Sequence, residues 1–225
     1  GSVALICSLT RSVEGAGGLT FWELFGLQSQ SVVPACVHSL ALTAILFVGP
    51  LVQHLLNVQD GIVSFVGGWP GGNGWIALRN LVLAPMAEEF VFRSCVVRLW
   101  VGAGFPWGMI ICVSPFMFAV AHAHHFVEHV RKTGDKKFAL VQVAFQVFYT
   151  SLFGMYCNFL LLRTGSTVAV ILNHSFCNHQ GFPDMGALAK GRHKYLLRPL
   201  YGLGIIGFVF LIAPLTRGFH SPYRV

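Results

Sequence analysis

Residues 138–162 read FALVQVAFQVFYTSLFGMYCNFLLL and contain no Asp, Glu, Lys or Arg. A run of roughly 20 apolar residues in an α-helix is long enough to cross the hydrocarbon core of a bilayer. This stretch therefore predicts a membrane-spanning helix. Residues 35–56 and the shorter stretch 200–215 also lack these four residue types, although His38 and His54 lie within the first of them.

The composition agrees with a membrane protein, because 55% of the residues are hydrophobic and only 10% are charged. A typical soluble domain is about 25% charged. The net charge of +7 would suit nucleic acid, but the basic residues gather between apolar stretches, at 131–137 and 190–198. That distribution is typical of cytoplasmic loops, so we do not predict a nucleic acid partner. The alternative interpretation of these basic residues is a patch that binds anionic lipid headgroups. Two apolar segments, 138–162 and 166–176, separate the basic loops, so we expect both loops on one side.

We predict an all-α fold, a polytopic bundle of transmembrane helices with an intramembrane catalytic cavity, in one domain over residues 1–225. Its core is 35–216, and residues 1–34 hold the end of a partial first span and an interfacial segment with Phe21, Trp22, Leu24 and Phe25. Expected helices cover 35–56, 75–101, 105–126, 138–162, 166–180 and 199–216, with Gly-rich residues at 57–74. The six scattered cysteines are expected to be buried thiols.

The segment EEFVFR, residues 88–93, places two carboxylates and a guanidinium in apolar surroundings. Glu89 and Arg93 are four residues apart, so they share a helix face and can pair, whereas Glu88 points about 100° away. The two glutamates are therefore not equivalent. Ionisable residues in membrane helices are costly and usually face a cavity, where a carboxylate can act as a general base. The alternative is an ion cluster that anchors a helix near the membrane surface.

Two further polar clusters follow on other apolar segments. In FMFAVAHAHHFVEH, residues 116–129, His122 lies four residues after Phe118 on one helix face. Its last part, with His125, Glu128 and His129, matches the inverted zinc-protease pattern H-x-x-E-H, or is an exposed helix end.

The third cluster is NHSFCNHQGFP, residues 173–183. His174 and Asn178 share a face, where they can donate two hydrogen bonds to one oxyanion. Hydrogen bonding between helices is the alternative.

Taken in order, the motifs E-E-x-x-x-R, F-x-x-x-H and H-x-x-x-N resemble the type II CAAX prenyl protease family. This Ras-converting endopeptidase group belongs to the wider abortive-infection protease superfamily. The resemblance covers about residues 36–216 and includes the flanking FGMYCNFLLLRTG. Members usually have eight transmembrane helices, whereas this sequence predicts six or seven, so we expect the first helix to be cut.

The resemblance implies a glutamate-type endopeptidase that removes the last three residues from proteins with a prenylated C-a-a-X box. Glu88 would activate the water, with His122 positioning it and shuttling the proton. His174 and Asn178 would stabilise the oxyanion, while Glu89 and Arg93 would orient Glu88. No metal or other cofactor is expected.

The expected substrates are farnesylated or geranylgeranylated proteins such as small GTPases. The expected location is the endoplasmic reticulum membrane, with the site open to the cytosol. A zinc protease using His125, Glu128 and His129, and a non-enzymatic scaffold or transporter, are the alternatives.

Overall fold

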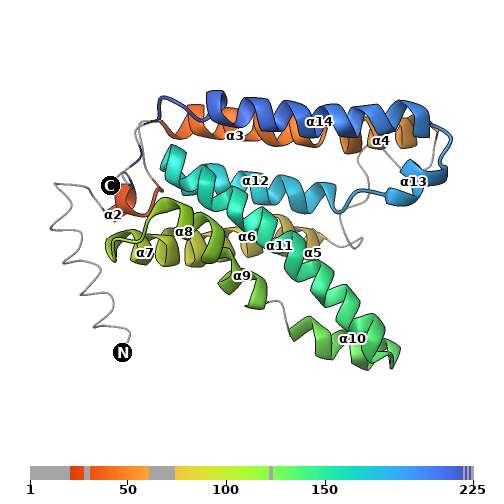
Figure 1. Ribbon diagram of the computed structural model, residues 1–225, viewed down its shortest axis with the longest axis horizontal. Helices are drawn as coiled ribbons and strands as arrows, with labels where there is room; N and C mark the ends of the chain where they lie inside the picture. Colours follow the sequence, from red (N-terminus) through yellow and green to blue (C-terminus); the bar gives the residue numbers. More distant parts are fainter. Residues whose placement is uncertain are drawn as a thin grey trace. The chain divides into compact units, whose positions relative to one another are not determined.

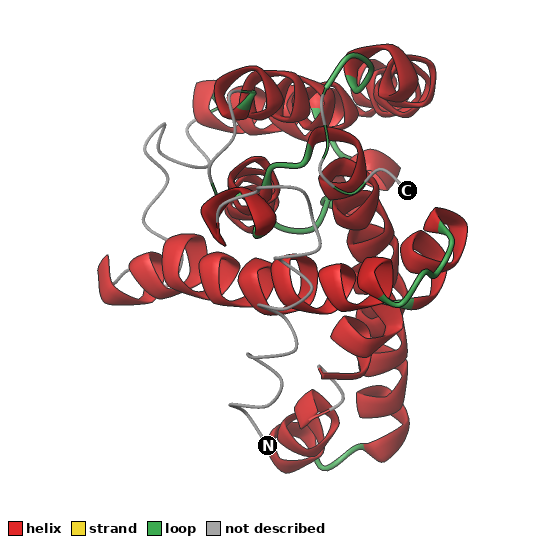
Figure 2. Ribbon diagram, turned by 90° about the vertical axis from the view of Figure 1, so that its left-hand side faces the viewer, coloured by secondary structure: helices red, strands yellow, loops and turns green. Residues whose placement is uncertain are grey.

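The computed structural model of this chain describes residues 21–27, 31–60, 74–121, 124–219, 221 and 223. Within these ranges all regular elements are helices, without any strand, as Figure 2 shows. The predicted all-α class is therefore confirmed. The chain divides into two compact units, one made of 1–29, 90–167 and 220–225 (unit 1) and one made of 30–89 and 168–219 (unit 2). The predicted single membrane domain stays a prediction.

Unit 2 carries eight of the described helical elements, with Thr167 at the start of one of them belonging to unit 1. They are α3 (Val32–Leu46), α4 (Val48–Gln59), α5 (Gly74–Leu78), η1 (Arg79–Leu83), α6 (Ala84–Glu89), α12 (Thr167–Gln180), α13 (Met185–Lys190) and α14 (Lys194–Leu215). Figure 1 shows the blue helix α14 running alongside the orange helices α3 and α4.

The expected span over 35–56 is helical but bent, since α3 and α4 meet at an angle of 71° around Phe47. Proline causes this break: Pro50 lacks an amide hydrogen, so it cannot donate to the carbonyl of Leu46 in the preceding turn. Helix α14 lies close to the bend because Gly204 has no side chain. A Cβ there would approach the carbonyl oxygens of Ile45 and Leu46 to 2.8 and 2.9 Å. A small residue thus permits close helix packing, as is common in membrane proteins.

Helix α12 is held against α3 by buried polar and apolar contacts. The hydroxyl of Thr43 contacts Oδ1 of Asn173, and Nδ2 of Asn173 donates to the Ala169 carbonyl at 2.7 Å. Ala35 and Ala169, on the same two helices, pack with Phe219. These contacts fix the rotation of α12 about its axis, because Asn173 has to face α3.

The predicted helix 75–101 is helical throughout, but it is not one regular α-helix. Two π-helical segments, η1 and η2 (Phe90–Val97), flank the short α6. The amide of Ala84 bonds the carbonyl of Arg79, five residues earlier. Pro85, which has no amide hydrogen, stands at the junction of η1 and α6 and accounts for the change in pairing. Such π segments frequently occur at functional sites.

Unit 1 contains the remaining described helices. They are α2 (Phe21–Leu24), η2, α7 (Arg98–Gly102), α8 (Trp107–Val113), α9 (Pro115–Ala121), α10 (His125–Thr133) and α11 (Lys136–Thr164). The predicted helix 105–126 is interrupted at Ser114, because Pro115 cannot donate a backbone hydrogen bond. Asn158 of α11 contacts this interruption, donating to the Ile110 carbonyl at 3.0 Å and to Oγ of Ser114 at 2.7 Å.

Two smaller expectations are only partly met. Trp22 is exposed as an interfacial residue would be, but Phe25 is buried, with its ring centroid 5.7 Å from that of Phe90. The five described cysteines are free, yet Cys112 is exposed, so it is not the buried thiol that we expected.

Two of the described helices, α11 and α14, are long and apolar enough to cross a membrane. The number rises to four if the bent pairs α3 with α4, and α8–α9 with α10, each form one span. Among the described residues this is fewer than the six or seven helices expected, because α12 is only 14 residues long and prolines or π segments divide the helices of 35–56, 75–101 and 105–126. The exposed Leu203, Val209 and Phe210 of α14 give it the apolar surface that lipid requires.

Candidate active site

One imidazole of α12 lies against both glutamates at the end of α6. Nδ1 of His174 is 2.6 Å from Oε1 of Glu89, and Nε2 is 3.7 Å from Oε2 of Glu88. All three residues belong to unit 2. The first contact is a short, charge-assisted hydrogen bond, and the second is an ion-pair distance without a hydrogen bond. The two neighbouring carboxylates therefore meet the two nitrogens of the same ring.

The two glutamates differ in exposure, as the helix geometry predicted. The side chain of Glu89 is fully buried, whereas that of Glu88 is 34% exposed. If Nδ1 of His174 carries the hydrogen that bonds Glu89, the ring is held in one tautomer and Nε2 faces the Glu88 side. Glu88 is thus the carboxylate that water can reach, and Glu89 is the one that holds the imidazole.

Asn178 lies one turn after His174, at the more exposed end of α12. Its Nδ2 donates to the backbone carbonyl of Asn80 in η1 at 3.0 Å. This bond joins α12 to the helical run that ends in Glu88 and Glu89. A primary amide has two N–H groups, so one donor of Asn178 is used in this bond and one is left for another acceptor. The role of Asn178 at an oxyanion stays a prediction.

Arg93 and Phe118, which belong to different motifs, meet in unit 1. The guanidinium carbon of Arg93 lies 4.5 Å from the ring centroid of Phe118, in a cation–π arrangement. Gly154 of α11 leaves room for Pro115 and Arg93, since a Cβ there would lie 2.7 Å from Cβ of Pro115 and 3.4 Å from Nη2 of Arg93. The arginine is almost completely buried. Its predicted pairing with Glu89 stays a prediction, and His122 lies outside the described residues.

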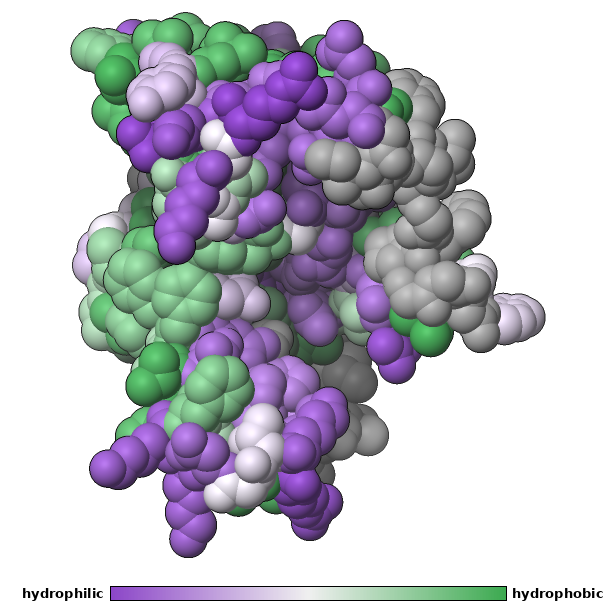
Figure 3. All heavy atoms as spheres, turned by 90° about the vertical axis from the view of Figure 1, so that its right-hand side faces the viewer, coloured by the Kyte–Doolittle hydropathy of each residue, from purple (hydrophilic) through white to green (hydrophobic). Residues whose placement is uncertain are grey.

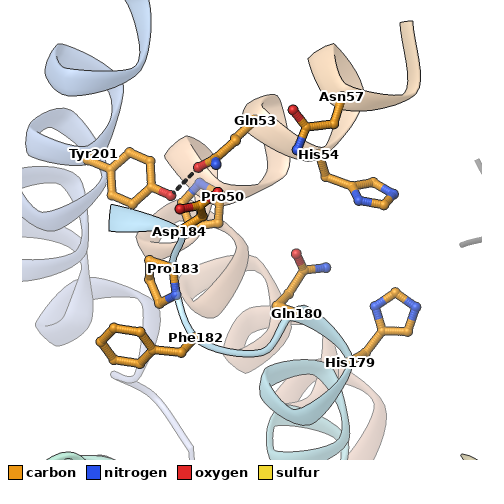
Figure 4. A pocket seen from close by; sticks show the side chains of 10 residues that line it. All are labelled: Pro50, Gln53, His54, Asn57, His179, Gln180, Phe182, Pro183, Asp184 and Tyr201. Atoms are coloured by element: carbon orange, nitrogen blue, oxygen red, sulfur yellow. Dashed lines mark hydrogen bonds between the residues drawn. The ribbon is translucent and has the colours of Figure 1, made fainter. Parts of the chain in front are cut away.

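A cavity of about 170 Å³ opens in unit 2 at the end of α12. Figure 4 shows His54 of α4 and His179 and Gln180 of α12 entering it, with the hydroxyl of Tyr201 bonded to Gln53. Glu88, Glu89 and His174 do not line this cavity. The predicted catalytic cavity therefore stays a prediction.

The basic segment 190–198 belongs to the same end of unit 2 as this cavity. Lys190, Arg192 and Arg198 are exposed there, and hydrophilic side chains gather in the upper part of Figure 3. Asp60, the residue after α4, binds this segment through Nε2 of His193 at 3.0 Å and Nη1 of Arg192 at 3.4 Å.

The inverted zinc motif falls on α10, in unit 1. Nδ1 of His125 lies 3.2 Å from Oε2 of Glu128, and both side chains are partly exposed. Within the described residues, the groups that could surround a metal ion are His124, His125 and Glu128, without His129. The second histidine grouped with Glu128 is therefore His124, and not His129 of the motif.

Known proteins are similar to most of this chain. The family described as type II CAAX prenyl endopeptidase Rce1-like matches residues 70–179. The human CAAX prenyl protease 2 is 34% identical over 225 residues, which cover 96% of this chain and 68% of that protein. This chain belongs to the type II CAAX prenyl endopeptidase family.

Other members of the family show comparable similarity. CAAX prenyl protease 2 of Arabidopsis thaliana is 32% identical, over 95% of this chain and 76% of the plant protein. A probable CAAX prenyl protease 2 of Schizosaccharomyces pombe is 30% identical, over 91% of this chain and 73% of its own length. No solved structure matches the chain.

The sequence motifs contain all three residues of the Glu88–Glu89–His174 cluster but do not predict their contact. From the motifs we expected Glu89 to pair with Arg93 and His174 to bind only the oxyanion. A signal for this contact was available in the sequence, because a buried carboxylate and a buried imidazole each need a polar partner. Which partner each one has could be known only from the packing of α12 against α6.

Proposed function

We propose that this chain is an intramembrane endopeptidase that cleaves prenylated CAAX proteins after the modified cysteine and releases the last three residues. The observation that carries the proposal is the cluster of Glu88, Glu89 and His174, in which one imidazole contacts two carboxylates of unequal exposure. Family membership supplies the substrate class. The shared name of the relatives, CAAX prenyl protease 2, agrees with it.

In this proposal Glu88 is the general base. Its partly exposed carboxylate takes a proton from a water molecule, whose oxygen attacks the carbonyl carbon of the prenylated cysteine. The resulting tetrahedral oxyanion collapses, the C–N bond breaks, and the proton passes to the leaving amine. Nε2 of His174 lies on the Glu88 side, so it is placed to hold the water or to donate to the oxyanion.

Glu89 is a positioning residue in the same scheme. Its hydrogen bond to Nδ1 orients the imidazole, as a buried carboxylate does in the Ser-His-Asp triad. The free amide hydrogen of Asn178 supplies a second donor to the oxyanion, while its other hydrogen stays bonded to Asn80. His122 would position the water and shuttle the proton, and Arg93 would orient the glutamates.

We further propose that the substrates include farnesylated and geranylgeranylated small GTPases, and that the site opens to the cytosol from the endoplasmic reticulum membrane. The isoprenoid partitions into the bilayer and brings the peptide to the enzyme within the membrane plane. The apolar, exposed surfaces of α11 and α14 support a location in lipid. No nucleic acid partner is proposed.

The test is cleavage of a fluorogenic farnesylated CAAX peptide by the detergent-purified chain in the presence of a strong chelator. Wild type should cut, and Glu88→Ala and His174→Ala should each lose at least about 10²-fold in kcat/KM, since general acid–base groups contribute about 10²–10⁴-fold. His179→Ala, on the exposed end of the same helix, is the matched control and should retain activity.

Three outcomes would count against the proposal. Normal turnover by Glu88→Ala would remove the glutamate mechanism. Loss of wild-type activity through the chelator alone would favour the zinc protease. A folded wild-type chain that cleaves no prenylated peptide would favour a scaffold.

A further inference from the structure

A cluster of metal-ligating side chains at the start of α10 has no part in the proposed reaction. His124, His125 and Glu128 each offer one ligand atom, and these atoms all lie within 4.8 Å of one another. A tetrahedral zinc ion with bonds of about 2.0–2.2 Å holds its ligands roughly 3.3–3.6 Å apart. The three side chains therefore have to close by about 1 Å, and partly exposed side chains are free to do so.

The hydrogen bonds of the cluster already favour a ligand arrangement. Nδ1 of His124 lies 2.7 Å from the carbonyl oxygen of Ala121, so it carries the hydrogen and leaves the lone pair on Nε2. Metal-binding histidines commonly use the second ring nitrogen in this way, because the bond to a carbonyl fixes the tautomer and the ring orientation. The side chains of His125 and Glu128 are held together by their own contact at 3.2 Å.

The fold explains why these three residues converge. His124 precedes the first residue of α10, and His125 and Glu128 are three positions apart, so they share the first turn of that helix. The rings of His124 and His125 lie with their centroids 4.1 Å apart. His129, on the following turn, is outside the cluster. The grouping thus includes a residue that precedes the helix, and the H-x-x-E-H spacing does not describe that position.

We propose that His124, His125 and Glu128 form a binding site for one divalent transition metal ion of the zinc class, separate from the hydrolytic residues. Two imidazoles and one carboxylate suit zinc better than magnesium or calcium, which prefer oxygen ligands throughout. Three protein ligands leave a fourth position for water. The positive end of the α10 dipole opposes the cation, so binding is weaker than at closed four-ligand zinc sites.

The test measures metal binding to the full chain in detergent, after the chelator has been removed. Bound zinc is counted by elemental analysis after gel filtration. Cobalt(II) absorption, displaced by zinc, reports the ligand geometry. We expect one zinc ion per chain. His124→Asn and Glu128→Gln should each weaken binding by at least about tenfold, the loss that even outer partners of metal ligands produce.

His129→Asn is the matched control, because this residue belongs to the H-x-x-E-H motif but not to the cluster. It should bind zinc as wild type does. Three results would overturn the proposal: wild type retaining no zinc, all variants binding equally, or His129→Asn weakening binding as strongly as His124→Asn. Size-exclusion profiles confirm that these variants of exposed and half-exposed residues fold.

Discussion

At the scale of single residues, the first motif has a specific contact with each of the other two. His174 of the third motif touches both glutamates of the first, and Phe118 of the second lies under Arg93 of the first. Glu89 is fully buried, and its described contact is with Nδ1 of His174. We therefore assign it to holding the imidazole, whereas the more exposed Glu88 is assigned to the chemistry.

Substitution of Glu89 separates ring orientation from charge. Glu89→Gln keeps an oxygen that can accept from Nδ1 of His174, so it should retain most of wild-type kcat. Glu89→Ala leaves a buried donor unpaired and should lose stability by about 1–3 kcal/mol and kcat by at least about tenfold. Steady-state kinetics and thermal unfolding in detergent provide the measurements. Equal losses in both variants would show that the charge of Glu89, and not its hydrogen bond, is required.

At the scale of elements, α12 has to be rotated correctly for His174 to meet α6. Asn173 precedes His174 and faces α3 through Thr43, while Asn178 bonds the carbonyl of Asn80 in η1. Successive helical residues point about 100° apart, so anchoring Asn173 on α3 also sets the direction of His174. The two π segments around α6 likewise set the direction of Glu88 and Glu89.

Thr43→Val tests this anchoring, because it removes the hydroxyl and keeps the branched shape. Oδ1 of Asn173 then loses that buried donor, so unfolding free energy should fall by about 1–3 kcal/mol, with a lower kcat. Ser39→Ala is the matched control on the same buried face of α3. Among the described residues its Oγ has no hydrogen-bond partner, so the change should be nearly neutral. Similar effects of the two substitutions would argue against the anchoring role.

At the scale of the whole molecule, the apolar composition and the basic segments predict a multi-pass protein with 131–137 and 190–198 on one side of the membrane. The amphipathic character of these segments fits, because α10 and the start of α14 carry exposed basic side chains. Their common side stays a prediction, which rests on the positive-inside bias.

Cysteine labelling in intact microsomes tests the topology. In a background without native cysteines, Thr133→Cys and Ala189→Cys should both react with an impermeant maleimide added from the cytosolic side. Val209→Cys, exposed on the spanning helix α14, should stay unreactive because lipid covers it. If only one of the first two reacts before permeabilisation, the segments lie on opposite sides.

The sequence by itself determined the helical class, the apolar helices of a membrane protein and the three motifs on which the candidate site is built. Apolar runs, and charged residues within them, are local signals, because each residue has its own free energy of transfer into lipid. The identities of Glu88, Glu89 and His174 were readable for the same reason. The order of the three motifs can likewise be read from the sequence without knowledge of the fold.

Only the tertiary structure decided which groups meet. The contact of His174 with both glutamates, the bend at Phe47 and the grouping of His124 with Glu128 depend on helix rotation, on prolines and on segments distant in sequence. These are set by packing, in which Gly204 and Gly154 permit close approach. The H-x-x-E-H spacing assumes a regular α-helix, so it did not indicate that His124, which precedes the helix, groups with Glu128.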